Sequence, residues 1–130
     1  MNVLGIRYCT VTPDAEALAR FLGPEGFGLT PRPMELPEGE SLPPGIDPDG
    51  FLGAVFPVGE GDASWIELWP DSQGMPAGTM LQIVVDDADA WAARAKENGL
   101  SPMGPTDAHG ERIYFLQAPG GAGITFQSKL

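Results

Sequence analysis

Two segments of the chain, residues 7–23 and 79–95, carry nearly the same pattern of a strand followed directly by a helix. They read RYCTVTPDAEALARFLG and TMLQIVVDDADAWAARA. Asp14 and Asp87 stand at the two expected helix starts, where an Asp side chain satisfies or offsets the free backbone N–H groups. This internal repeat constrains the fold because each copy predicts one strand and one helix in the same order.

Alternating apolar residues and turn signals predict three more strands after each helix. These lie at about 27–34, 51–58 and 64–70 in the first half and near 101–104, 112–117 and 123–128 in the second. Residues 30–50 are rich in Pro, Gly and acid, which predicts a long surface loop. The chain is therefore expected to be one α+β domain, 1–130, made of two tandem βαβββ repeats at about 1–72 and 76–130.

Composition limits the possible partners and the compartment. The 130 residues include 7 Lys and Arg against 18 Asp and Glu, so the net charge is -11. This balance argues against nucleic acids and anionic membranes, and it favours a cationic ligand or simply keeps the protein soluble. A single Cys, no apolar run long enough to cross a bilayer and no signal-peptide pattern lead us to expect a cytoplasmic protein.

The order of these motifs resembles the vicinal oxygen chelate superfamily, which includes glyoxalase I, bleomycin resistance proteins and extradiol dioxygenases. The segments that carry the resemblance are VTPDAEALARFLGPEGFGL, MLQIVVDDADAWAARAKENGL and GERIYFLQAPGGAGITFQ. The last segment is similar to a G-x-R…F-x-DPDGN-x-IEL ending, with Ala118 and Gly120 in the places of its acids. The resemblance implies curved mixed sheets around a ligand cleft. It also implies a homodimer, and it leaves open whether two chains share one cleft.

The resemblance also implies where a divalent metal would bind. Metal-dependent members use one ligand from the first strand and one from the last strand of each repeat, usually His, Gln or Glu. In this chain those positions fall on Arg7 (Tyr8 if the register shifts by one), Glu67, Met80 and Thr125. Arg has no acceptor atom, and Met is a soft ligand that suits Mg, Mn or Fe poorly. We therefore expect no cofactor, unless a divalent metal binds through other ligands.

Strand alternation predicts the residues that contact a ligand. Trp65, Glu67 and Trp69 share one strand face, while Ile66 and Leu68 point toward the helix. Two Trp residues beside a Glu suit a planar or cationic small molecule. Alternatively, both Trp residues fill a dimer interface or plug the cleft, and Arg7 pairs with Glu67. The predicted ligand contacts are Arg7, Trp65, Glu67, Trp69, Met80, Gln82 and Thr125.

Three functions are compatible with these features. The first is a metal-independent protein that binds and sequesters a small molecule in an aromatic-lined cleft. The second is a lyase, isomerase or dioxygenase that uses a divalent metal, or Glu67 as a general base. The third is a non-catalytic interaction module with a collapsed cleft.

Overall fold

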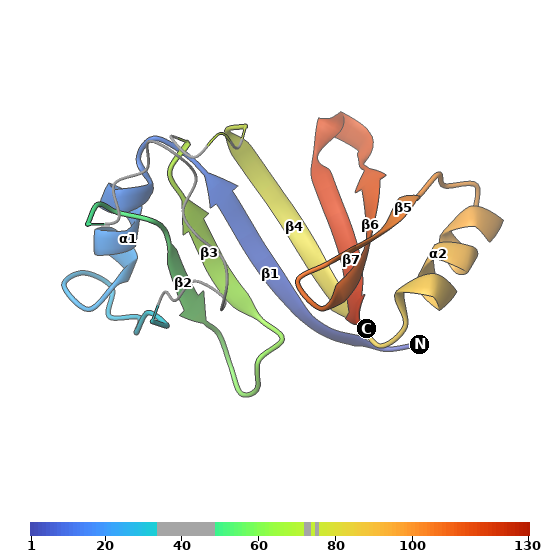
Figure 1. The fold of residues 1–130 in the computed structure, drawn as a ribbon, viewed down its shortest axis with the longest axis horizontal. Coiled ribbons are helices and arrows are strands. Elements are labelled where there is room, and N and C mark those ends of the chain that lie inside the picture. The colour runs from blue at the N-terminus through green and yellow to red at the C-terminus, as the bar shows by residue number, and fades with distance from the viewer. Residues whose placement is uncertain (34–48, 72–73, 75) are drawn as a thin grey trace. The chain divides into compact units, whose positions relative to one another are not determined.

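A computed structural model describes residues 1–33, 49–71, 74 and 76–130 (Figure 1). Its seven strands form a mixed sheet in the order β2-β3-β1-β4-β7-β6-β5, and two helices accompany them. This is the α+β class that the sequence predicts. In chain order the elements are β1 (Val3–Val11), α1 (Ala15–Leu22), β2 (Ala54–Pro57), β3 (Trp65–Trp69), β4 (Gly78–Val85), α2 (Ala88–Glu97), β5 (Met103–Ala108), β6 (Glu111–Gln117), the 3-10 turn η2 (Pro119–Gly121) and β7 (Gly123–Lys129).

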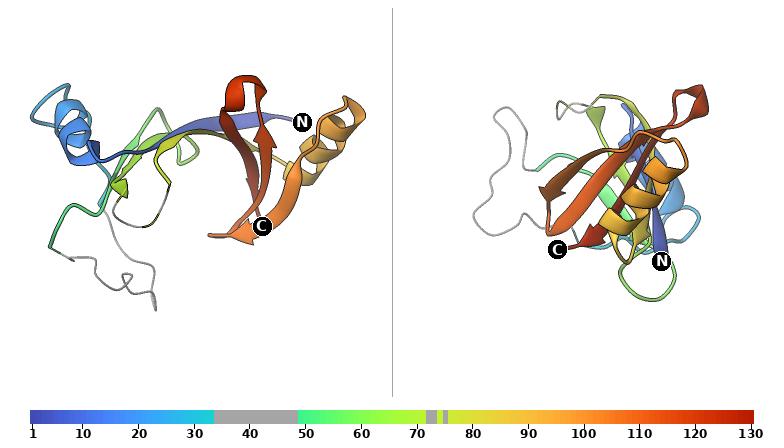
Figure 2. Two further views of the ribbon diagram at one scale, coloured as in Figure 1. Left: turned by 90° about the horizontal axis from the view of Figure 1, so that it is seen from above. Right: turned by 90° about the vertical axis from the view of Figure 1, so that its right-hand side faces the viewer.

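The chain divides into two compact units. The first unit contains residues 1–8, 61–64 and 79–130, and α2 covers one face of its strands β6 and β7 (Figure 2). Strand β4 is parallel to β7, whereas β6 is antiparallel to both β7 and β5. Asp87 is the N-cap of α2, and its side chain accepts a hydrogen bond from the Ala90 N–H at 3.2 Å. The core of this unit consists of Val85, Ala88, Ala92, Tyr114 and Phe126, with Ile83, Trp91 and Leu116 packed against it.

The second unit contains the described residues of 9–60 and 65–78. Strands β2 and β3 are antiparallel, and Ala54 pairs with Leu68. The fully buried Leu68 confirms the prediction that this side of β3 points toward the helix. The core of this unit consists of Ala15, Ala54, Phe56 and Leu68, with Leu18, Ala19, Leu22, Leu29, Phe51 and Ile66 packed against it.

The predicted strand at 27–34 is wrong over its described part, residues 27–33. That stretch forms only an isolated bridge, in which the Arg32 N–H donates to the Val55 carbonyl at 2.7 Å. Pro31 and Pro33 flank the bridge and lack the N–H groups that a longer ladder requires. Most of the loop predicted at 30–50 lies outside the described residues. None of the helices in the described part of the chain is long and apolar enough to cross a membrane.

Candidate functional site

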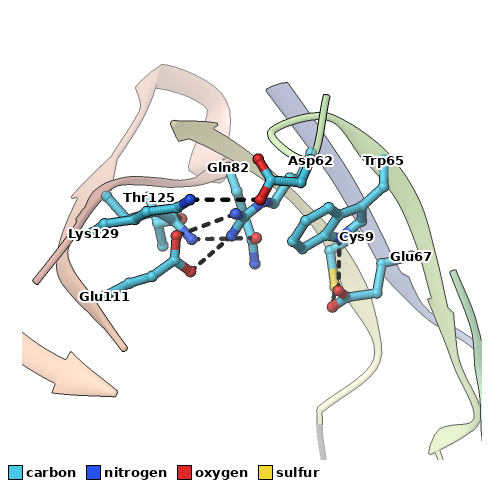
Figure 3. A network of polar contacts seen from close by, with 10 residues as sticks. Cys9, Asp62, Trp65, Glu67, Gln82, Glu111, Thr125 and Lys129 are labelled. Carbon is cyan, nitrogen blue, oxygen red and sulfur yellow. Dashed lines mark hydrogen bonds and ion pairs between the residues drawn. The ribbon is translucent and has the colours of Figure 1, made fainter. Parts of the chain in front are cut away.

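The side chain of Glu67 lies between two tryptophans on β3. Trp65 Nε1 donates to Glu67 Oε1 at 2.8 Å (Figure 3). Trp69 Nε1 donates to Glu67 Oε2, also at 2.8 Å. Residues two apart on a strand share a face, so the sequence WIELW places both indoles beside the carboxylate while Leu68 enters the core. The structure thus brings these three predicted site residues together.

Cys9 adds a third donor to the same carboxylate. Its Sγ lies 3.4 Å from Glu67 Oε2 and donates to it (Figure 3). Burial, followed by the negative charge of Glu67, raises the pKa of the Cys9 thiol from 9.0 to about 12. The thiol is therefore a protonated donor and a poor nucleophile. Alternation places Cys9 on the same side of β1 as Arg7, but the sequence carries no signal that it reaches Glu67.

No cation neutralises Glu67 within the ranges that the structure describes. The charged pairs there join other residues, and all three donors to the Glu67 carboxylate are neutral. Its negative charge is thus fixed in position by hydrogen bonds and has no ion-pair partner in those ranges. A carboxylate held in this way can provide a counter-charge to a positively charged ligand.

The two indole rings have different neighbours. Gly53 lies so close to the Trp69 ring that a Cβ at this position would be 2.5 Å from Cε3 of the ring. The guanidinium carbon of Arg32 lies 5.0 Å from the centroid of the Trp65 ring, which is cation–π geometry. The sequence carries no signal for Arg32, because this residue precedes β3 by more than thirty residues and belongs to no motif.

The structure pairs Arg7 with Glu111, inside the first unit, whereas the sequence suggested Glu67 as its alternative partner. Arg7 Nη1 and Nη2 donate to the two carboxylate oxygens of Glu111 at 2.8 and 3.1 Å. Tyr8 is 45% exposed whereas Arg7 is buried, so Arg7 is the inward residue of this part of β1. Glu111 begins β6, and nothing in the sequence indicated it as the partner of Arg7.

The remaining predicted residues lie on β4 and β7 in the first unit. Thr125 Oγ1 donates to Gln127 Oε1 at 2.8 Å, and Gln127 Nε2 donates to Gln82 Oε1 at 3.4 Å. Met80 pairs in register with Gly123. Thr125 and Gln82 are therefore linked through Gln127, whereas Trp65, Glu67 and Trp69 belong to the second unit.

No protein-family model matches the chain, and no curated protein matches it in sequence. Several solved structures match in fold. One is a glyoxalase/bleomycin resistance protein/dioxygenase superfamily member from Vibrio splendidus 12B01, with a TM-score of 0.59 and 15% identity, covering 95% of this chain and 97% of that one. Methylmalonyl-CoA epimerase from Mycobacterium tuberculosis matches with a TM-score of 0.59 and 19% identity over 98% of this chain and 87% of that one. Another methylmalonyl-CoA epimerase structure has a TM-score of 0.60 and 19% identity over 98% and 94%.

The chain has the vicinal oxygen chelate fold. The resemblance seen in the sequence is thereby confirmed for the fold. At these identities the similarity is structural and does not transfer an activity.

The four positions that the resemblance implies for a metal carry a guanidinium, a carboxylate, a thioether and a hydroxyl, a set that fits a divalent ion poorly. Arg7 is a cation bound to Glu111, and Met80 is a thioether. The Thr125 hydroxyl already donates to Gln127, and three donors use the oxygens of Glu67. Among the residues that the structure describes, no three His, Cys, Asp or Glu side chains gather as a metal-binding group.

An open surface depression of about 350 Å³ lies elsewhere in the first unit. Its lining contains the ion pair of Arg112 and Asp89, and each partner has a further contact outside the lining: Arg112 donates to Asp107, and Tyr114 Oη donates to Asp89 at 2.6 Å. These hydrogen bonds lower the pKa of Asp89, with that from Tyr114 as the largest cause. The depression is lined by Asp86, Asp87, Asp89, Arg112, Ser128, Lys129 and Leu130, and it contains none of the predicted site residues.

Proposed function

We propose that this protein is a metal-independent small-molecule-binding protein of the glyoxalase/bleomycin resistance type, which binds a cationic or aromatic ligand at Trp65, Glu67 and Trp69. The observation that carries the proposal is the Glu67 carboxylate, held by two indole N–H groups and a thiol without an ion pair in the described ranges. The hydrogen bonds fix the carboxylate in place, and the rings supply apolar contact area and cation–π attraction.

Binding fits this arrangement better than general-base catalysis. An ionised carboxylate has about four lone-pair sites, and the donors to Glu67 use three of them. Little acceptor capacity is left for a substrate proton. The lyase, isomerase or dioxygenase alternative retains the support of the fold, since two of the similar structures are epimerases. The interaction module with a collapsed cleft is the third candidate.

Several wider features belong to the same proposal. We propose two tandem βαβββ repeats whose curved sheets surround the ligand cleft, with Arg7, Met80, Gln82 and Thr125 as further ligand contacts. A homodimer and a cytoplasmic location complete it. The order of the second half, β4-α2-β5-β6-β7, and the similar solved structures support the repeat architecture.

Tryptophan fluorescence tests the binding proposal directly. The chain has three Trp residues, so Trp91→Phe leaves Trp65 and Trp69 as the only fluorescent indoles. Benzyltrimethylammonium serves as the cationic probe, with neutral benzyl alcohol and anionic benzoate as comparisons. We expect a saturable change in emission with the cation and weaker responses to the other two probes.

Glu67→Gln removes the counter-charge at almost constant size. We expect it to weaken binding of the cation by about tenfold, which corresponds to a screened charge–charge attraction lost near the protein surface. Glu16→Gln is the matched control, because Glu16 is an exposed Glu of α1 in the same unit. Equal affinities in the Glu67→Gln and Glu16→Gln proteins would contradict the proposed role of Glu67.

A further inference from the structure

Arg32 is anchored in the second unit by its backbone and rests on Trp65 through its side chain. Its N–H donates to the carbonyl of the buried Val55 at 2.7 Å, which ties the residue to β2. Its guanidinium carbon then lies 5.0 Å from the centroid of the Trp65 ring. The residue itself is solvent-exposed. The position of this cation on the ring is therefore set by a short backbone contact and by cation–π attraction.

Glu67 and its three donors, Cys9, Trp65 and Trp69, are called the Glu67 cluster below. The distribution of positive charge in the same unit distinguishes Arg32 from the other basic residue there. The second unit contains two basic residues among those described, Arg20 and Arg32. Arg20 pairs with Glu16 at 3.0 Å. Arg32 forms no ion pair with a carboxylate in the described ranges, and the contact that positions its charge there is the Trp65 ring. The same indole donates its N–H to Glu67.

We propose that the Arg32 guanidinium occupies the face of Trp65 on which a cationic ligand would stack, so that such a ligand must displace Arg32 to bind. This inference rests on the proposed function of the Glu67 cluster. Two cations on the same ring face repel each other, so the ligand and Arg32 cannot both occupy it. Displacing Arg32 costs the cation–π attraction between its guanidinium and the ring. Arg32 thus acts as a tethered competitor. Cations that stack on Trp65 more weakly than a guanidinium are excluded, and ligands that stack on it more strongly are favoured.

Quenching by caesium tests the competition without any assumption about the ligand. In the Trp91→Phe background, Cs⁺ and neutral acrylamide are compared at constant ionic strength. We expect Arg32→Gln to raise the Cs⁺ quenching constant by about two- to fivefold, the size of an exposed cation–π contact. Acrylamide quenching should change much less, because acrylamide carries no charge.

Two further variants control for net charge and for the cation itself. Arg20→Gln removes the same charge from the same unit and should leave Cs⁺ quenching unchanged. Arg32→Lys keeps a cation on the ring and should resemble the parent protein. Equal Cs⁺ quenching in the Arg32→Gln and Arg20→Gln proteins would overturn the inference.

Titration with benzyltrimethylammonium separates this inference from the proposed function. We expect Arg32→Gln to tighten binding by about two- to fivefold relative to Arg20→Gln. If Glu67→Gln weakens binding but Arg32→Gln does not tighten it, the inference fails and the proposed function stands. If Arg32→Gln changes Cs⁺ quenching but Glu67→Gln leaves binding unchanged, the proposed counter-charge function fails, while the occupation of Trp65 by Arg32 is supported.

Discussion

At the scale of single residues, Arg7 and Glu111 form a largely buried ion pair in the first unit. Its side chains are 8% and 14% exposed, and the two groups form a bidentate contact at 2.8 and 3.1 Å. Removing two charges from water is costly, and close pairing offsets that cost only while both partners are present. The pair therefore makes each of its members sensitive to substitution.

Glu111→Gln is expected to destabilise the protein by about 3 kcal/mol, because a neutral amide replaces the carboxylate that accepts hydrogen bonds from Arg7 Nη1 and Nη2. Urea unfolding followed by circular dichroism measures this change in the free energy of unfolding. Glu16→Gln is the control, since its exposed i,i+4 pair with Arg20 should be worth about 0.5 kcal/mol or less. The double variant Arg7→Met/Glu111→Leu should recover most of the loss. Equal stabilities of the two single variants would show that the buried pair is unimportant.

The raised pKa of the Cys9 thiol predicts that the folded protein loses stability at alkaline pH. Its pKa is raised from 9.0 to about 12 by burial and by Glu67, so between these values the folded protein keeps a proton that the unfolded chain releases. Folding stability should therefore be fully present below about pH 9 and fall as the pH rises toward 12. Cys9→Ser should flatten this fall, because Ser does not titrate there. Parallel urea midpoints for the two proteins from pH 8 to 10.5 would contradict the role of Cys9.

At the scale of elements, strand faces follow the sequence but the ends of the helices do so only in part. Asp87 caps α2 with a side-chain hydrogen bond, as its sequence position predicts. Asp14 occupies the same place before α1, but its side chain forms no capping bond, and its N–H donates instead to Thr12 Oγ1 at 3.2 Å. Equal sequence signals can thus have different local outcomes.

Gly53, which precedes β2, lets the backbone pass close to the Trp69 ring on β3 because it has no Cβ. Gly53→Ala should destabilise the protein by about 2 kcal/mol and shift Trp69 emission, because the residue has a φ of 139° and a Cβ would meet the ring. Gly59→Ala is the control: its φ is 72° but nothing lies within 4 Å of a Cβ there. We expect it to cost about 1 kcal/mol without a change in emission. Chemical unfolding and fluorescence spectra measure both effects, and identical spectra for the two variants would refute the contact.

At the scale of the whole molecule, the proposal of a metal-independent protein rests on the side chains at the four positions that the resemblance implies for a metal. One carboxylate, one thioether, one hydroxyl and one guanidinium stand at the four positions that the resemblance implies. The formal charge of -11 attracts cations in general, so weak binding at the surface must be distinguished from a site.

We expect no stoichiometric binding of Ni, Zn, Mn or Fe(II) after purification without chelators and dialysis against salt. Elemental analysis of the dialysed protein and calorimetric titration with each ion provide the measurement. One tightly bound ion per chain would contradict the metal-independent proposal, and it would favour the lyase, isomerase or dioxygenase alternative. The Glu67→Gln protein then shows whether that ion depends on the carboxylate.

The sequence by itself determined the α+β class, the two helices, most of the strands and the inward face of β3. Local periodicity is sufficient for this, because alternation along a strand assigns each side chain to a face whatever the strand pairs with. It also grouped Trp65, Glu67 and Trp69, which are two residues apart. The predicted strand at 27–34 does not form over its described part, because Pro31 and Pro33 lack the N–H groups that a ladder of hydrogen bonds requires.

Only the tertiary structure decided which distant groups meet. Arg7 and Glu111 are 104 residues apart, and Cys9 and Glu67 are 58 apart. These pairings depend on strand order and register, which no periodicity within one segment encodes. The contact of Arg32 with Trp65 likewise depends on a bridge to β2 rather than on a motif. A sequence thus specifies the face on which a side chain lies, whereas its partner is set by the packing of the complete sheet.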